Sequence, residues 1–322
     1  MINAYKTIGD SFKTVPQEDI KAQSNDIFWV DLFHPTSEEE SFIESWLGVN
    51  IPTHDKMHEI EQSSRLYQHD QTLFMTLTML THADTPQPES HDVSFVIHNN
   101  ILITTRYVNT QPFDLSSHEN ISKDTYKNGS ALLTWMLDKI IDHLADTLES
   151  IAKQVEETGR QIFDTQDNSS TSPIKFRKVI SSIGLHQNLL SITQEGLFSA
   201  TRLLSFISEM PLFKEPLEKK AVHSMMRDLP PLIEHATFLS NKINFLLDAT
   251  LGMINIEQNT IIKIVSLATV VFLPPTLVAS VYGMNFHSIP ELQWEHGYPF
   301  AIILMVLAGF LPYAYFKFKK WF

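Results

Sequence analysis

The chain has 322 residues, a length that allows one soluble domain of ordinary size together with further elements. It contains no Cys, which excludes disulfides and thiolate metal sites. The net charge of −13 argues against nucleic acid as a partner and favours cations; the plainer alternative is that the acidity only confers solubility. The sequence carries no HExxH, GxSxG, P-loop or GxGxxG motif, so we expect no enzyme and no catalytic residue.

The first part of the chain mixes strand and helix patterns. Residues 29–32 predict a short strand, and Pro35-Thr36-Ser37 followed by three Glu predicts a helix start, since acids favour the positive end of the helix dipole. The apolar runs 93–98 and 101–105 flank Asn99-Asn100, a layout typical of a tight hairpin. We therefore expect a cytoplasmic α/β domain over residues 1–125.

Two long helical patterns follow this domain. Residues 131–163 place apolar side chains at helical spacing, a polar stretch at 165–173 interrupts the pattern, and a second helix is expected over 174–210. The two helices form an antiparallel pair within a helical segment at 126–227. The first helix has an acidic face, which is either merely solvated or senses divalent cations; its members are Asp138, Asp142, Asp146, Glu149, Glu156 and Glu157.

A third helix is expected to continue into a membrane. Asp228-Leu229-Pro230-Pro231 is a favourable helix start, because Pro is tolerated where the amide has no partner in the helix. No strong break follows until Pro274-Pro275, and a helix running on to Gly283 has about 53 residues, or roughly 80 Å. A bilayer core takes up only ~30 Å, so the rest is expected to be a cytoplasmic stalk. We assign 228–286 to the stalk and first span.

Residues 264–286 and 298–316 contain no charged residue, and each is long enough to span a bilayer. The segment between them, 287–297, has two Glu and no Lys or Arg, while Lys residues flank the spans on the other side. The positive-inside rule therefore predicts two membrane spans, an external loop at 287–297, and cytoplasmic termini including a basic tail at 317–322. A buried helical hairpin of a soluble protein is the alternative.

One face of the third helix carries nearly all the hydroxyl residues of the first span. Stepping alternately four and three residues, a spacing that keeps one face towards partner helices in a supercoiled bundle, gives this stripe: Asp248, Gly252, Asn255, Asn259, Ile262, Ser266, Thr269, Leu273, Thr276, Ser280 and Gly283. Small and hydroxyl residues also mediate close helix packing. The stripe continues below the membrane through three polar residues, which packing does not require, so we interpret it as pore-lining in an assembly of several copies.

Within that pore, Ile262 and Leu273 are expected to form apolar rings that exclude water. Thr269, Thr276 and Ser280 are then wetted positions. Pro274 and Pro275 leave the carbonyls of residues 270 and 271 without amide partners, so these carbonyls either line the pore or mark a bend.

Several motifs resemble the CorA magnesium transporters. They include Tyr282-Gly283-Met284-Asn285, Ile289-Pro290-Glu291-Leu292, Gly297-Tyr298-Pro299 and the Lys-rich end at 319–322. Similar segments at 29–32, 59–67, 102–107, 255–259 and 272–276 extend the resemblance over nearly the whole chain. Ile289 stands where the family usually has Met. The Gly-Met-Asn motif is shared with ZntB-type zinc transporters, which lack the Pro-Glu-Leu loop.

The resemblance implies an α+β membrane protein that forms a funnel-shaped homopentamer in the bacterial inner membrane. It implies a channel or transporter for hydrated Mg²⁺, with Co²⁺ and Ni²⁺ as further candidate ions. Self-association, the lipid bilayer and divalent cations are the expected partners. A ZntB-like Zn²⁺ transporter and a membrane-anchored divalent-ion sensor without a pore are the alternatives.

Roles for single residues follow from the chemistry of Mg²⁺, which gives up its water reluctantly. Neutral oxygens of Asn285, Gly283 and Met284 suit a ring that contacts the hydrated ion, because five carboxylates would hold it too tightly. Glu291 in the loop would concentrate cations, and Asn259 and Asp248 would pass the ion on. Gating by intracellular Mg²⁺ is expected, and the resemblance suggests Asp228 as a regulatory ligand.

Overall fold

The computed structural model describes residues 1–8, 11–110, 113, 128–163, 173–213, 215–285, 290 and 294–319. The chain divides into two compact units. Unit 1 comprises Met1–Asp167 and Arg177–Leu247, and unit 2 comprises Asn168–Phe176 and Asp248–Phe322. The expected domain boundary near residue 125, the polar break at 165–172 and the last three residues of the basic tail lie outside the described residues.

Unit 1 contains a seven-stranded mixed sheet with the order β2-β1-β3-β7-β6-β5-β4. Only β3 and β7 pair in parallel; the other neighbours are antiparallel. The strands are β1 (Ile2–Ile8), β2 (Ser11–Val15), β3 (Ile27–Phe33), β4 (Leu66–His69), β5 (Thr72–Thr81), β6 (Glu89–His98) and β7 (Ile101–Arg106). The α/β character expected for this region is confirmed.

Local sequence signals explain two features of the sheet and its first helix. Asn99 and Asn100 have φ of 48° and 66°, which is the conformation of a type I′ hairpin turn, and they connect β6 to β7 as predicted. Helix α1 (Ser37–Leu47) begins with a capping box: the Glu39 amide donates to Thr36 Oγ1 and the Thr36 amide donates to Glu39 Oε2. Short helices α2 (His54–Met57) and α3 (Gln62–Arg65) follow.

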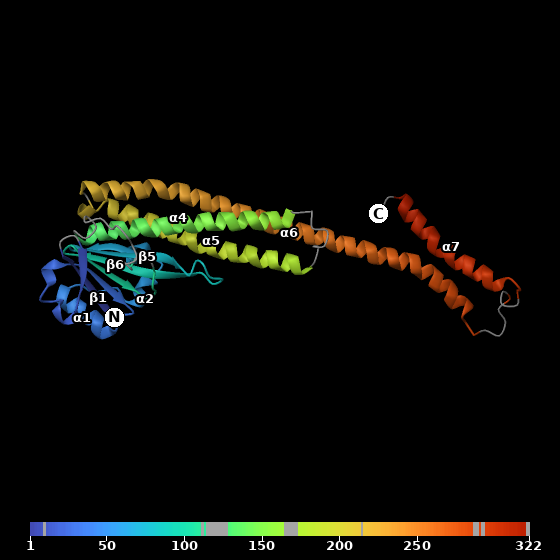
Figure 1. The fold of residues 1–322 in the computed structure, drawn as a ribbon, viewed down its shortest axis with the longest axis horizontal. Helices are drawn as coiled ribbons and strands as arrows, with labels where there is room; N and C mark the ends of the chain where they lie inside the picture. Colours follow the sequence, from blue (N-terminus) through green and yellow to red (C-terminus); the bar gives the residue numbers. More distant parts are fainter. Residues whose placement is uncertain are drawn as a thin grey trace. The chain divides into compact units, whose positions relative to one another are not determined.

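The sheet of unit 1 is covered on both faces (Figure 1). On one face α1 packs over a core of aliphatic side chains, with Phe42 and Trp46 at its margin; the core includes Val30, Leu32, Ile43, Phe74, Val96, Ile101 and Ile103. On the other face lie the long helices α4 (Gly129–Phe163) and α5 (Pro173–Ser208). The Thr78 amide donates to Ser199 Oγ at 3.0 Å, which ties β5 to α5.

Helix α6 (Pro216–Tyr282) has 67 residues and belongs to both units. Its start differs from the expectation: the helix begins at Pro216 rather than near Asp228, and Pro230 and Pro231 lie inside it. Pro216 meets the same physical requirement, since it occupies the first turn, where no amide partner is needed. Helix α7 (Gly297–Phe318) completes unit 2, and the short 3-10 helices η1, η2 and η6 are Gln17–Asp19, Ser24–Asp26 and Pro211–Phe213.

The C-terminal part of α6 and all of α7 are long and apolar enough to cross a bilayer, by length and composition. The apolar window of α6 is not buried in the chain, and that of α7 is 11% buried. Exposure of this kind differs from the core hairpin of a soluble protein, which would be covered.

Candidate functional site

The stripe predicted from the sequence is an exposed face of α6. Every described member is solvent-exposed in the single chain; they are Asp248, Gly252, Asn255, Asn259, Ile262, Ser266, Thr269, Leu273, Thr276, Ser280 and Gly283. We call this set the seam. Because successive residues turn by about 100° around an α-helix, the alternating step of four and three keeps the members on one side of α6.

Helix α7 covers the side of α6 opposite to the seam. A Cβ on Gly309 of α7 would lie 3.2 Å from the Val271 carbonyl oxygen and 3.2 Å from Pro275 Cγ. The half-buried positions in the apolar part of α6 lie mostly on the same side: Leu267, Val270, Val271, Pro274, Pro275, Val278 and Tyr282. Val271 lies two positions beyond Thr269, which places it about 200° around the helix. Packing between the two helices therefore leaves the seam uncovered.

Small residues recur among the covered positions of α7, where Met305, Pro312, Ala314 and Phe316 are also half-buried. Ala301 and Gly309 are buried and Ala308 is half-buried. Small residues let helix backbones approach closely in a bilayer, where helices gain no hydrophobic driving force. No role was predicted for these residues from the sequence, although small side chains that recur seven to eight positions apart could have predicted a helix-packing face.

Two threonine hydroxyls on the seam donate their hydrogens to the helix backbone. Thr269 Oγ1 donates to the Val265 carbonyl at 2.9 Å, and Thr276 Oγ1 donates to the Phe272 carbonyl at 2.7 Å. A hydroxyl has one donor and two acceptor lone pairs, so each oxygen keeps acceptor capacity. The seam can therefore accept hydrogen bonds from the water shell of a cation.

The paired prolines leave the carbonyls of residues 270 and 271 without amide partners, and the structure shows where one of these two carbonyls lies. The Val271 carbonyl, which would have bonded the missing Pro275 amide, faces Gly309 of α7. This carbonyl therefore lies on the side of α6 away from the seam. Helix α6 continues through both prolines to Tyr282.

The Gly-Met-Asn motif directly follows the end of α6. The Gly283 amide still donates to the Ala279 carbonyl at 2.9 Å, and the Met284 amide donates to the Val281 carbonyl at 3.3 Å. A Cβ on Gly283 would lie 3.1 Å from the Ala279 carbonyl oxygen, so glycine provides room for the turn to close. Asn285 is exposed beyond this last turn. Glu291, the expected loop residue, lies outside the described residues.

Within unit 1, α6 exposes one face and buries another. Phe238 and Phe245 of this part of α6 are 58% and 60% exposed, and Asn241 between them is also exposed. The opposite face of α6 is buried there through Leu239, Ile243 and Leu246.

The tentative regulatory residue Asp228 lies near acids of α4. Burial raises the pKa of Asp138, and the neighbouring carboxylates of Asp142 and Asp228 raise it further, while Lys139 opposes them. Asp228 is exposed, and its nearest ion-pair partner is Arg227 Nε at 3.8 Å. Over the described ranges, no group of three or more His, Asp or Glu side chains could hold a metal ion within one chain.

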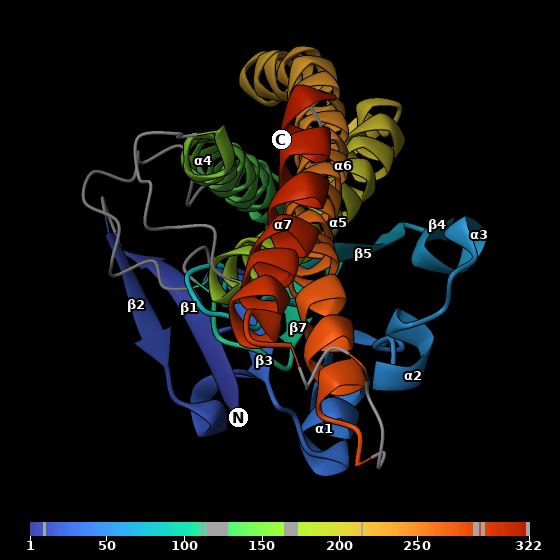
Figure 2. The same ribbon diagram turned by 90° about the vertical axis from the view of Figure 1, so that its right-hand side faces the viewer.

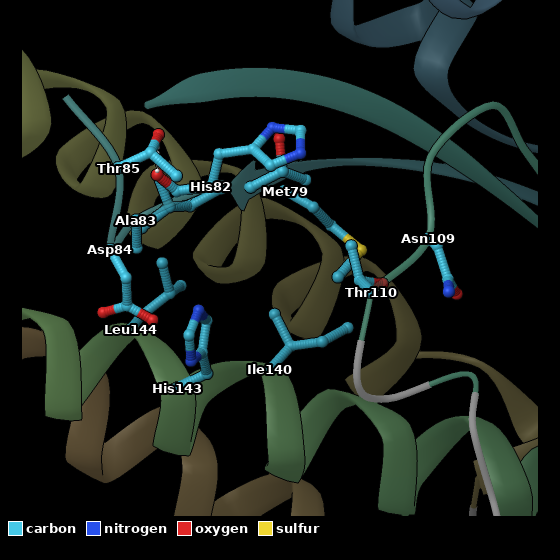
Figure 3. A pocket seen from close by; sticks show the side chains of 12 residues that line it. Met79, His82, Ala83, Asp84, Thr85, Asn109, Thr110, Ile140, His143 and Leu144 are labelled. Carbon is cyan, nitrogen blue, oxygen red and sulfur yellow. Dashed lines mark hydrogen bonds between the residues drawn. The ribbon is translucent and has the colours of Figure 1, made fainter. Parts of the chain in front are cut away.

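A separate hollow lies in unit 1 between the end of β5 and α4 (Figure 3). Asp84 and His143 lie on one side of it, and His82 lies beside Thr85 on the other. Its lining also includes the apolar Met79 and Ile140. Among the described residues of this hollow, no three His, Asp or Glu side chains lie close enough together to hold a metal ion. We therefore do not treat the hollow as a candidate ion site.

Comparison with known proteins identifies the family. The model of the family described as "CorA-like Mg2+ transporter protein" matches residues 24–320. The chain belongs to the CorA family. Magnesium transport protein CorA of Pasteurella multocida (strain Pm70) is 33% identical over 323 residues, and that of Escherichia coli (strain K12) is 33% identical over 322 residues. Both matches cover 100% of each chain.

Solved structures show that the CorA fold extends over the whole chain. The complete structure of the CorA magnesium transporter from Methanocaldococcus jannaschii gives a TM-score of 0.73 at 17% identity, covering 98% of this chain and 97% of that one. The full-length CmaX protein gives a TM-score of 0.70 at 15% identity, covering 100% and 98%. At these identities the likeness concerns the fold.

Proposed function

We propose that this CorA-family chain moves hydrated Mg²⁺ across a membrane through a pore lined by the seam of α6. The observation that carries the proposal is the geometry of unit 2: α7 packs on one side of α6 and leaves a line of neutral oxygens exposed on the other. In a bilayer such polar groups need to face water or protein rather than lipid. A water-filled axis meets that need.

A pore of this kind requires several copies, because each chain contributes one seam. We propose a homopentamer, in line with the family resemblance of the sequence. The exposed Phe238 and Phe245 of α6 support association, since large exposed apolar side chains of this kind would be covered by neighbouring copies. Both termini would lie in the cytoplasm, because Lys263, Lys317 and Lys319 flank the spans on that side.

The selectivity proposed for the outer end rests on neutral dipoles. Mg²⁺ demands octahedral oxygen geometry and usually keeps several waters when it binds a protein. Five Asn285 carboxamides, with carbonyls of Gly283 and Met284, would contact that water shell without the strong attraction of carboxylates. Glu291 would add a general attraction for cations at the mouth.

The closed state is proposed to combine dewetting with divalent binding. Ile262 and Leu273 are 60% and 61% exposed on the seam, and rings of them around an axis would exclude water from a narrow conduit. Five copies at −13 each give −65, so bound intracellular Mg²⁺ would stabilise the assembly against repulsion. Asp228 would share such an ion with acids of a neighbouring copy.

Two other functions remain as outcomes of the test. A ZntB-like protein would prefer Zn²⁺ over Mg²⁺ in the same pore. A membrane-anchored sensor would use its two spans only as an anchor, and the oxygens of the seam and Asn285 would carry no function. Uptake into liposomes separates all three.

The test is ion uptake by purified protein reconstituted in liposomes, with Mg²⁺, Co²⁺, Ni²⁺ and Zn²⁺ supplied in turn. We expect wild type to take up Mg²⁺ and Asn285→Ala to abolish that uptake. Ile303→Ala, which alters an exposed apolar residue of α7 away from the seam, is the matched control and should retain uptake. Normal uptake in Asn285→Ala, or a preference for Zn²⁺ in wild type, would contradict the proposal.

A further inference from the structure

Two histidines of unit 1 bring their ring nitrogens together beside α2. His54 is the first residue of α2 and His58 directly follows the helix, so they have the four-residue spacing that places two imidazoles on one helical face. Their Nε2 atoms are 3.3 Å apart. Both side chains are exposed, at the margin of the unit where α2 and α3 lie (Figure 2).

The two ring nitrogens are within hydrogen-bond distance, and their separation also matches that of two ligands on one ion. Protein hydrogen bonds from nitrogen to oxygen usually span about 2.7–3.2 Å. Two nitrogens bound tetrahedrally to one ion at about 2.0–2.1 Å lie about 3.3–3.4 Å apart. The observed 3.3 Å therefore leaves room for an ion bridging both imidazoles.

The neighbouring residues fix the ring of His58 in the orientation that a metal ligand needs. His58 Nδ1 is 3.1 Å from Asp92 Oδ2, and an ionised carboxylate can only accept, so Nδ1 carries the hydrogen and Nε2 presents its lone pair. Asp92 is itself held by Arg65 Nη2 at 2.6 Å and by Thr78 Oγ1 at 2.8 Å. A carboxylate behind a ligating histidine is the usual outer partner in protein metal sites.

The ring of His54 is positioned by an aromatic neighbour. It packs edge-on against Tyr107, with ring centroids 4.4 Å apart and an interplanar angle of 89°. Met57, between the two histidines, is 1% exposed and anchors this short helix in the core. The pair is thus a held arrangement at the surface rather than two free side chains.

We propose that His54 and His58 form a binding site for a divalent transition ion such as Zn²⁺, Ni²⁺ or Co²⁺, with water completing the coordination. Imidazole nitrogen suits these ions, whereas Mg²⁺ prefers oxygen ligands. Since the chain has no Cys, histidines are its strongest donors for ions of this class. The site is distinct from the seam and does not depend on the proposed transport activity.

The test is calorimetric titration of full-length protein in detergent with Zn²⁺, in a millimolar excess of Mg²⁺ that fills oxygen sites. We expect wild type to bind a zinc ion that His54→Ala and His58→Ala each fail to bind. His69→Ala, which removes another exposed histidine, should bind as wild type does. Asp92→Asn should weaken binding by about 10–100-fold if Asp92 orients His58.

The melting temperature of each variant serves as the folding control, and we expect the substitutions of exposed histidines to leave it unchanged. Zinc binding that is unchanged in both His54→Ala and His58→Ala would overturn the proposal. So would absence of zinc binding in wild type, or its loss in the presence of excess Mg²⁺.

Discussion

A buried ion pair organises the centre of the sheet in unit 1. Asp31 of β3 is 1% exposed and accepts from Arg106 Nη2 at 2.8 Å, Arg106 Nε at 3.0 Å and Thr104 Oγ1 at 2.8 Å. Arg106 also lies over the rings of Phe33 and Phe113. The parallel pairing of β3 with β7 brings these partners side by side.

Replacing Asp31 by Ala should destabilise unit 1 strongly. The change leaves the buried guanidinium of Arg106 without its carboxylate, and breaking a buried pair in this way lowers the free energy of unfolding by about 3–5 kcal/mol. Chemical denaturation of the full-length protein, followed by Trp fluorescence, measures the loss. Glu149→Ala, at a carboxylate of α4 that is 72% exposed, should change stability by less than about 0.5 kcal/mol. Equal losses of stability in the two variants would contradict a special role for the buried pair.

Some residue-scale features were readable in the sequence and others were not. The Asn99-Asn100 turn and the helix start at Thr36 depend on local chemistry, so short motifs predicted both. The Asp31–Arg106 pair joins residues far apart in the chain, and the His54–His58 pair depends on a third residue from β6. Contacts of this kind depend on strand order, which no local pattern specifies.

The periodicity of apolar residues predicted that the long helices exist and roughly how far they extend, but it did not predict where α6 begins. α4 and α5 lie within a few residues of the expected ranges, because their apolar spacing ends where the helices end. The predicted start of α6 was wrong, because Pro is tolerated in the first turn of a helix and both Pro216 and Pro230-Pro231 could therefore begin one. The seam is exposed in the single chain, as are many residues between its members, and the helix that packs on the opposite side could not be deduced from α6 alone.

The contact between α6 and α7 gives a prediction at this scale. Gly309→Leu places a branched side chain where even a Cβ would lie 3.2 Å from the Val271 carbonyl oxygen, so the helices must separate or shift. We expect a lower melting temperature in detergent and reduced Mg²⁺ uptake in liposomes. Val306→Leu, at a position that is 65% exposed on α7, is the control and should behave as wild type. A Gly309→Leu protein with unchanged melting and uptake would show that this contact has no such role.

In the whole molecule, the groups that surround the exposed seam of α6 determine whether the chain can form a pore. In unit 2 the seam is exposed while α7 packs on the other side of α6, and in unit 1 Phe238 and Phe245 of α6 are exposed. Membership of the CorA family came from motifs and from similarity over the full chain. The number of copies is a property of the assembly, and neither the sequence pattern nor a single chain specifies it.

Because the chain has no Cys, single cysteines can be introduced along α6 without removing any native thiol. Thr276→Cys and Ser280→Cys lie on the seam, whereas Leu277→Cys is equally exposed in the single chain but one position off it. The most direct measurement is Mg²⁺ influx into liposomes before and after a positively charged, membrane-impermeant thiol reagent.

If the seam lines the pore, the reagent should block influx through Thr276→Cys and Ser280→Cys and leave wild type and Leu277→Cys unaffected. Block of Leu277→Cys alone, or unchanged influx through both seam variants after verified labelling, would contradict a pore along this face of α6.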